Sequence, residues 1–379
     1  MKVIHVIAGL NDGGAEAVLY RLCVQDKSHT HVVISLMDEG KYGPLLEKIG
    51  ITVICLSMPR GKVTLSGLIK LWQLLRQIKP DALQTWMFHA DLIGGVIGRL
   101  AGIKNITWGI HSSNLEPNKT KRSTILVASV CAKLSRWVPR NIIYCAARSR
   151  EVYERLGYCP KKGKIIPNGY NISEFRPDRN LVDEVVVELG LNTAIPIIGM
   201  VARFDPQKDH KNLICALGIL KKRGTNFTCL LIGSGLDKKN ERLLGWIKEN
   251  NASKEVYLLG KRNDVPAIMN VIDLHVLSSS FGEAFPNVIC EAMASGTPCV
   301  ATDVGDSKVI IASTGWVAPP NNAALLAECI ALALDEKETE EAAWNNRRNA
   351  SRKRIVDNFS IETMVNSYQG VWSACGSSV

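Results

Sequence analysis

The sequence predicts an α/β protein made of two doubly wound domains, each with a parallel sheet. Short apolar runs alternate with helical patterns along most of its 379 residues. A glycine-rich turn directly follows the first apolar run, and the alternation starts afresh at Pro196. Because parallel strands need a crossover connection, usually a helix, this alternation indicates βαβ units in two successive domains.

The first half begins with a strand pattern at 3–8, then the turn from Asn11 through Gly13 and Gly14, then a helical pattern. Glycines here let backbone N–H groups approach a ligand phosphate. The turn matches neither G-x-G-x-x-G nor a P-loop, so by itself it also fits a tight strand–helix connection. Further strands are expected at 31–36, 51–56, 82–86, 105–110 and 141–145, and helices at 43–49, 66–78, 90–101 and 123–137.

Two histidines of this half follow predicted strands. His89 comes just after 82–86, and His111 follows 105–110 and opens a polar loop. Doubly wound sheets bind ligands at the carboxyl ends of their strands. A lone histidine is as often structural as functional, but the position of His111 favours a place in a ligand site.

The charge of the chain is unevenly distributed. Residues 1–170 contain 24 Lys/Arg and 11 Asp/Glu, whereas residues 171–379 contain 22 and 25. The net charge of +13 in the first half indicates an anionic partner: a membrane surface, a lipid phosphate or a nucleic acid. Lys119, Lys121 and Arg122 precede an amphipathic segment, 125–137, which could lie on an anionic membrane or be an ordinary helix with a solvated basic face.

A domain boundary is expected near 170–190. The segment 165–171 is read as a short strand ending in a turn, and the net charge changes sign after it. Strands of the second domain are expected at 196–202, 227–232, 255–259, 273–277 and 298–302. The loop after the first of these contains Arg203 and Lys208, whose planar fork and mobile point charge suit a diphosphate, although such loop residues are often only solvated.

The stretch 278–298 provides the most specific local pattern. Glu283 lies in a loop after a predicted strand, and Glu291 lies in the second turn of a helix that Pro286 opens and Gly296 closes. A helix N-terminus beyond a parallel strand favours an anion, whereas a carboxylate there suits hydroxyl groups. Together these features indicate a nucleotide-sugar site.

Composition narrows the cellular setting. The N-terminus is too short and too strand-like for a signal peptide, and no apolar run approaches the ~18–20 residues of a membrane span. Eleven cysteines are scattered singly without a C-x-x-C pair, as expected of buried thiols in a reducing compartment. We therefore expect a cytoplasmic protein.

The ordered motifs resemble those of retaining glycosyltransferases of family 4. The resemblance rests on Val201-Ala-Arg203-Phe-Asp-Pro-Gln-Lys208, on Leu231-Ile-Gly-Ser-Gly, on Gly260-Lys-Arg-Asn-Asp-Val and on Glu283-x7-Glu291-Ala-Met-Ala-Ser-Gly-Thr-Pro. The Gly13-Gly14 loop and the Ile166-Pro-Asn168-Gly169 segment extend it over nearly the whole chain.

The resemblance implies a GT-B fold, in which two Rossmann-like domains face each other across a cleft. The acceptor-side domain would be 1–170, with the final helix within 361–379 packing back on it, and the donor-binding domain would be 171–360.

By motif matching, Arg203 and Lys208 would hold the donor diphosphate, with Gly13 and Gly14 closing from the other domain. Glu291 would bind the ribose and Glu283 the donor sugar. The remaining donor contacts implied by the resemblance are Lys261, Arg262, Phe285, Pro286, Asn287 and Val288.

The same resemblance implies a metal-independent reaction with retention and without cofactor, in which the departing phosphate takes the acceptor proton. His111 would line the reacting centre. A UDP-sugar is the expected donor and a lipid-linked saccharide the expected acceptor, with His89, Asn11, Lys119, Lys121 and Arg122 on the acceptor side. The protein would lie peripherally on the inner face of the cytoplasmic membrane.

Two departures from the family pattern bear on the donor sugar: Ala284 replaces a common glycine, and Lys308 has no assigned role. Two alternatives stay open, a sugar-nucleotide epimerase or hydrolase on the same fold and a non-catalytic nucleotide-sugar-binding partner. No nucleic-acid-binding motif appears, and the basic residues are not interleaved with aromatic ones.

Overall fold

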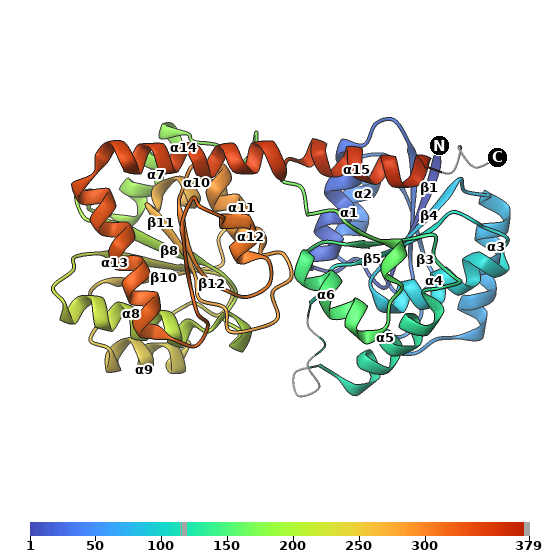
Figure 1. The fold of residues 1–379 in the computed structure, drawn as a ribbon, viewed down its shortest axis with the longest axis horizontal. Coiled ribbons are helices and arrows are strands. Elements are labelled where there is room, and N and C mark those ends of the chain that lie inside the picture. The colour runs from blue at the N-terminus through green and yellow to red at the C-terminus, as the bar shows by residue number, and fades with distance from the viewer. Residues whose placement is uncertain (114, 116–119, 375–379) are drawn as a thin grey trace. The chain divides into compact units, whose positions relative to one another are not determined.

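The computed structural model describes residues 1–113, 115 and 120–374. The chain forms two compact units: unit 1 consists of 1–169 together with the segment from Ile361 onward, and unit 2 consists of Tyr170–Ser360 (Figure 1). Each unit is a parallel sheet with helices on both faces, so the expected α/β architecture is confirmed. The predicted Lys119 lies outside the described residues.

The sheet of unit 1 has the strand order β3-β2-β1-β4-β5-β6-β7, and neighbouring strands pair in parallel. Its strands are β1 (Lys2–Ile7), β2 (Thr30–Ser35), β3 (Thr52–Cys55), β4 (Ala82–Trp86), β5 (Ile106–Ile110), β6 (Asn141–Tyr144) and β7 (Gly163–Ile165). The strands of β1, β4 and β5 are adjacent, so the loops that follow them share one edge of the sheet.

Two helical layers cover this sheet, because the side chains of each strand alternate between its faces. Val3 and Ile7 of β1 pack towards α1 and α15, whereas Ile4 and Val6 pack towards the layer that contains α3, α4 and α5. The helices are α1 (Gly14–Gln25), α2 (Tyr42–Lys48), α3 (Leu65–Ile78), α4 (Phe88–Leu100), α5 (Arg122–Leu134), α6 (Ala147–Leu156) and α15 (Ile361–Ser373), with a 3-10 turn η1 (Pro160–Lys162).

The final helix, α15, belongs to unit 1 although it follows unit 2 in the chain. Met364, Tyr368 and Trp372 recur every four residues and are buried in the same core as α1. This periodicity places one apolar stripe of the helix on the sheet.

Unit 2 has the strand order β10-β9-β8-β11-β12-β13, also with parallel pairing. Its strands are β8 (Ile197–Val201), β9 (Thr228–Ile232), β10 (Val256–Gly260), β11 (Leu274–Leu277), β12 (Cys299–Thr302) and β13 (Trp316–Ala318). Its helices are α7 (Arg179–Leu189), α8 (His210–Lys222), α9 (Glu241–Glu249), α10 (Val265–Val271), α11 (Asn287–Ala294), α12 (Ser307–Ile311), α13 (Ala323–Thr339) and α14 (Glu341–Asn358), with a 3-10 turn η2 (Pro206–Lys208).

The sequence located the strands well but missed several elements. The segment 170–190, read as a boundary, contains α7, which Asp178 caps at its N-terminus and Gly190 ends in the left-handed conformation. Helix α5 ends at Leu134, three residues before the predicted end at 137, and Pro139 follows soon after. Residues 135–137 form a turn in place of the predicted last helical turn.

Within the described residues, no helix combines the length and the apolar character needed to cross a bilayer.

Candidate functional site

The predicted donor residues of unit 2 gather at one edge of its sheet. Strands β8 and β11 are neighbours, and their carboxyl ends lead into the loops that contain Arg203, Lys208 and Glu283. Strands β9 and β10, which lead into Gly233 and Lys261, continue the same edge. The parallel sheet therefore brings together loops, from Arg203 to Glu283, that are separated in sequence by several βαβ units.

Lys208 and Glu283 form an ion pair at this edge. The Nζ of Lys208 lies 2.5 Å from Oε1 of Glu283, with side chains only 15% and 8% exposed. The same oxygen accepts a hydrogen bond of 2.7 Å from Oγ of Ser279. Few water molecules reach these charges, so the ion pair holds the two side chains in place. A cation and a carboxylate that can accept hydrogen bonds therefore lie next to each other.

The serines after β11 hold the turn that presents Lys208. Oγ of Ser278 donates to the carbonyl oxygens of Lys208 and Asp209, at 2.9 and 3.0 Å, and the backbone N–H of Ser280 donates to the carbonyl of Gln207 at 2.9 Å. These serines are not among the residues predicted for the site. Three consecutive serines directly after a buried strand are the signal that could have identified them.

Two glycines permit close backbone contacts around this site. Gly305 has φ +63°, and a Cβ there would lie 2.5 Å from the carbonyl oxygen of Glu283. Gly233 has φ +148°, and a Cβ there would lie 2.0 Å from the carbonyl oxygen of Ala202. Glycine is therefore required at both positions, and Gly305 supports the loop that contains Glu283.

Helix α11 begins at Asn287, directly after this loop, and no side chain caps it at Pro286. Its first residues are tied to the chain that enters unit 2: the hydroxyl of Tyr170 donates to Oδ1 of Asn287 at 2.5 Å, and the rings of Tyr170 and Phe285 stack at 6.4 Å. Phe285 is buried, so its side chain supports the loop.

The other predicted donor residues differ in environment. Arg203 is 63% exposed and lies 3.2 Å from Asp205 through its Nε. Arg262 is bound by Glu188 and Asp264, and these two partners raise its pKa. Arg262 thus has a structural part, tying α7 to the loop after β10, beside the base-binding part that motif matching implies.

The residues predicted in unit 1 share one edge of its sheet as well. The turn from Asn11 to Gly14 follows β1, His89 lies in the first turn of α4 after β4, and His111 directly follows β5. A Cβ at Gly14 would meet no atom within 4 Å, so the start of α1 faces open space. Lys121 and Arg122 are exposed at the start of α5.

His111 is the most enclosed of these residues. Its imidazole stacks on Trp86, with ring centroids 5.0 Å apart and an interplanar angle of 24°, and its Nε2 lies 3.5 Å from the hydroxyl of Tyr368. Burial lowers the pKa of His111 to about 4, although an interaction with Asn168 acts in the opposite direction. His111 is therefore neutral at physiological pH and can orient a hydroxyl group without competing as a cation.

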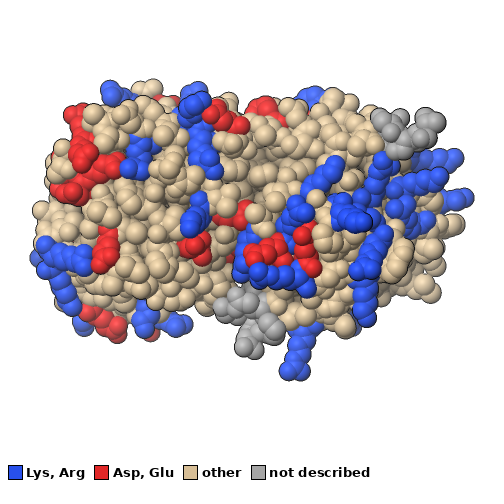
Figure 2. Space-filling model, viewed as in Figure 1, with Lys and Arg blue, Asp and Glu red and all other residues tan. Residues whose placement is uncertain are grey.

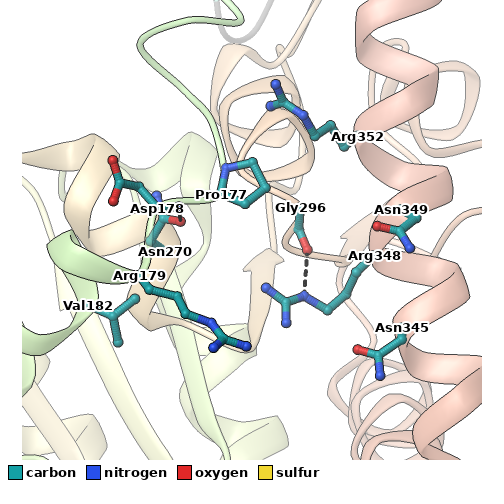
Figure 3. Close-up of a pocket in the computed structure, with 10 residues that line it drawn as sticks. All are labelled: Pro177, Asp178, Arg179, Val182, Asn270, Gly296, Asn345, Arg348, Asn349 and Arg352. Carbon is teal, nitrogen blue, oxygen red and sulfur yellow. Dashed lines mark hydrogen bonds between the residues drawn. The ribbon is translucent and has the colours of Figure 1, made fainter.

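A cavity of about 330 Å³ lies elsewhere in unit 2, between α7 and α14 (Figure 3). Arg179, Arg348 and Arg352 line it, and Nε of Arg348 donates to the carbonyl of Gly296 at 3.1 Å. None of the predicted donor residues lines this cavity, so it is separate from the candidate site.

Two family models match the chain in succession. Residues 12–174 match the model described as Glycosyltransferase Family 4, and residues 183–350 match Glycosyl transferases group 1. The chain belongs to this glycosyltransferase family. The two matched segments fall in unit 1 and unit 2, respectively, apart from the first five residues of unit 2, 170–174.

Relatives of this glycosyltransferase include bacterial enzymes with named activities. It is 25% identical over 313 residues to the UDP-Gal:alpha-D-GlcNAc-diphosphoundecaprenol alpha-1,3-galactosyltransferase of Escherichia coli, covering 81% of this chain and 79% of the relative. It is 24% identical over 327 residues to the capsular polysaccharide biosynthesis glycosyltransferase CapM of Staphylococcus aureus, covering 80% and 81%.

Among solved structures, the glycosyltransferase is similar to Anabaena Alr3699/HepE in complex with UDP. The TM-score is 0.86 at 22% identity, and the match covers 99% of this chain and 100% of the other. At this identity the similarity establishes the fold, which is GT-B.

Proposed function

We propose that the glycosyltransferase moves a sugar from a UDP-sugar to a lipid-linked saccharide, with retention of anomeric configuration and without a metal ion. The observation that supports this most directly is the buried pair of Lys208 and Glu283 at the carboxyl edge of the unit 2 sheet. It places a cation for phosphate oxygens beside a carboxylate for sugar hydroxyls, which are the two kinds of group that a nucleotide-sugar presents.

The charge that develops on the leaving diphosphate would be stabilised by Lys208, Arg203 and the N-terminal turn of α11. Arg203 lies on the exposed side of this group and can turn towards a ligand, since its contact with Asp205 is solvent-accessible. Glu283 would accept hydrogen bonds from the donor sugar, and Glu291 from the ribose. No side chain is assigned as a nucleophile, and the departing phosphate would take the acceptor proton.

The proposed acceptor follows from the relatives. One relative is named for a GlcNAc-diphosphoundecaprenol acceptor and another for capsular polysaccharide biosynthesis. A lipid-linked acceptor would also explain the positive charge of residues 1–170 and would place the protein on the inner face of the cytoplasmic membrane. Asn11, His89, Lys121 and Arg122 remain the proposed acceptor-side residues, and Lys119 remains proposed from the sequence.

A thermal-shift panel with UDP, GDP and ADP, each with and without EDTA, tests the donor part. UDP is expected to raise the melting temperature whether or not EDTA is present, because ligand binding to the folded state stabilises it by mass action. A shift that EDTA abolishes would refute metal independence, and no shift with UDP would refute the donor assignment.

Retention is tested with the donor that this panel and a sugar screen identify. Proton NMR of the product is expected to show the same anomeric configuration as the donor. Release of free sugar at an equal rate with and without lipid-linked acceptor would instead favour the hydrolase reading.

A further inference from the structure

The helical layer of unit 1 that contains α3, α4 and α5 exposes an unusual amount of apolar surface. Within the described part of unit 1, the other large exposed apolar side chains are only Met1, Leu45 and Ile165. Those on or beside this layer are Val63, Leu65, Ile69, Trp72, Leu100, Leu126, Val130 and Trp137. Exposed apolar residues gathered on one face mark an interaction surface.

Helix α3 presents these residues as a stripe. Leu65, Ile69 and Trp72 are spaced at i, i+4 and i+7, so they lie on one side of the helix, and they are 73%, 48% and 40% exposed. The guanidinium of Arg76 lies over the ring of Trp72 at 5.6 Å, which continues the stripe with a cation. The opposite side of α3 is buried through Leu71 and Leu75.

Helix α5 repeats this arrangement. Leu126 and Val130 lie one turn apart and are 66% and 37% exposed, while Ala128 and Ala132 bury the opposite side. Lys133 follows on the exposed side, and Trp137, just beyond the helix, is 70% exposed. Helices α3 and α5 both pack against α4, which places the two stripes on the same layer.

The charge around these stripes has one sign. The described residues between 56 and 140 contain 12 Lys/Arg and only two acidic residues, Asp81 and the fully buried Asp91. Figure 2 shows Lys and Arg without Asp or Glu at the edge of unit 1 where Figure 1 draws α3. Apolar anchors with tryptophan, surrounded by cations, fit the interface of an anionic bilayer, where tryptophan is enriched and nearby basic residues are attracted to the lipid headgroups.

We propose that α3 and α5 together form a membrane-docking surface for anionic lipid, with Trp72 and Trp137 as the anchors. The biological purpose of this surface rests on the proposed lipid-linked acceptor, but its binding to lipid requires no turnover.

The test is flotation of the full-length protein with phosphatidylcholine vesicles, with and without roughly 30% phosphatidylglycerol. Wild type is expected to float only with the anionic vesicles. The Trp72→Gln/Trp137→Gln variant is expected to bind these vesicles at least about tenfold more weakly than wild type. A matched variant of unit 2, Val187→Gln/Leu332→Gln, removes apolar groups that are 81% and 59% exposed and is expected to bind like wild type.

Equal binding by the tryptophan variant, or no binding of wild type to anionic vesicles, would overturn the proposal. The response of each variant to UDP in the thermal-shift assay is measured in parallel. Vesicle binding without a UDP response would contradict the proposed reaction and leave the docking surface standing, whereas the converse would contradict the surface alone.

A second inference comes from a buried polar chain in the other layer of unit 1. Trp86 donates its Nε1–H to Nδ1 of His5 at 3.2 Å, and Nε2 of His5 lies 2.9 Å from Nδ1 of His31. Nε2 of His31 lies 3.3 Å from a carboxylate oxygen of Asp26. His5 and Trp86 are fully buried.

The tautomers of the two histidines in this hydrogen-bonded series follow from Trp86, which stands at one end of the series. The indole of Trp86 can only donate, so Nδ1 of His5 must accept and its proton must be on Nε2, pointing to His31. Burial lowers the pKa values of both His5 and His31, which keeps both imidazoles neutral. Cys23 Sγ lies close enough for the group to resemble a metal site, but a metal on His5 would require an imidazolate while Trp86 donates.

The hydrogen-bonded series ends at Trp86, the ring on which His111 stacks. The Trp86 indole is fixed by His5 on one side, stacks on His111 at 5.0 Å, and stacks on Tyr368 at 5.9 Å. We infer that His5 is a positioning residue, which acts through Trp86 to hold the imidazole of His111 for the proposed reaction.

His5→Leu and His5→Asn separate positioning from packing. The asparagine side chain can keep an acceptor near the Nδ1 position, whereas leucine cannot. His5→Leu is expected to shift the ring signals of His111 in long-range proton–nitrogen NMR spectra and to lower kcat about tenfold or more with KM for the donor unchanged. His5→Asn is expected to retain the His111 signals and most of kcat.

Trp86→Phe serves if His5→Leu does not fold, since it removes the N–H donor and keeps a ring; the same loss of kcat is expected. Unchanged His111 signals in His5→Leu, or wild-type kcat in Trp86→Phe, would overturn the inference. The NMR signals are measurable without turnover, so failure of the proposed reaction can be recognised separately.

Discussion

Replacing Lys208 with methionine tests the geometry of the candidate site before any substrate is known. The change keeps the length of the side chain and removes the cation. The Glu283 carboxylate, 8% exposed, would retain the 2.7 Å hydrogen bond from the neutral hydroxyl of Ser279. Breaking a buried pair by removing one partner costs about 3–5 kcal/mol. Because Lys208 is 15% exposed and the serine contact remains, we expect the lower end, about 3 kcal/mol.

For a domain of about 150–250 residues, this corresponds to a fall of roughly 6–12 °C in melting temperature. The Lys208→Met/Glu283→Gln double variant removes both charges and should recover most of the stability. Differential scanning calorimetry of the three variants provides the cycle.

The pairing would be refuted if Lys208→Met and Glu283→Gln each lowered the free energy of unfolding by less than about 0.5 kcal/mol and their effects were additive in the double variant. That is the behaviour of a surface ion pair. Turnover should be abolished in all three variants, so stability and activity separate in the double variant.

The remaining predictions concern the frame of the site. Burial raises the pKa of Asp91 to about 7, so the folded protein favours the protonated carboxyl. The stability that the protonated carboxyl contributes is lost as the pH rises from about 4 to about 7. Asp91→Asn should therefore stabilise the protein at pH 8 more than at pH 5 in urea titrations. Gly233→Ala should destabilise unit 2 by more than about 2 kcal/mol in the same assay, because its Cβ would overlap the carbonyl of Ala202, and a neutral effect would contradict the turn geometry. Arg262→Ala should lower the melting temperature slightly, because the contact with Glu188 is lost; unchanged UDP affinity by calorimetry would assign Arg262 a structural role only.

The local pattern of the chain determined the fold class and the order of its elements. Alternation of apolar runs and helical periods located the strands of both units to within a residue or two, except β7, which ends where the predicted strand segment 165–171 begins, and β13, which was not predicted. The spacing from Glu283 to Glu291 placed one acid in a loop and the other on a helix. These features depend on neighbours in sequence, so periodicity and turn chemistry suffice to read them.

The segment around the domain boundary was harder to predict. The change in net charge after residue 171 and the new apolar run at Pro196 favour a linker at 170–190, whereas the structure forms α7 there. Helix α7 buries Val185 and packs against α10, a contact between segments that are distant in sequence.

The partners of the functional side chains were decided by tertiary structure alone. Lys208 meets Glu283 across 75 residues of sequence, and Trp86 meets His5 across 81, because β8 pairs with β11 and β1 pairs with β4. Strand order in a sheet is set by the packing of whole βαβ units, which no single segment encodes. The sequence therefore predicted which residues form the site, and only the fold determined which of them touch.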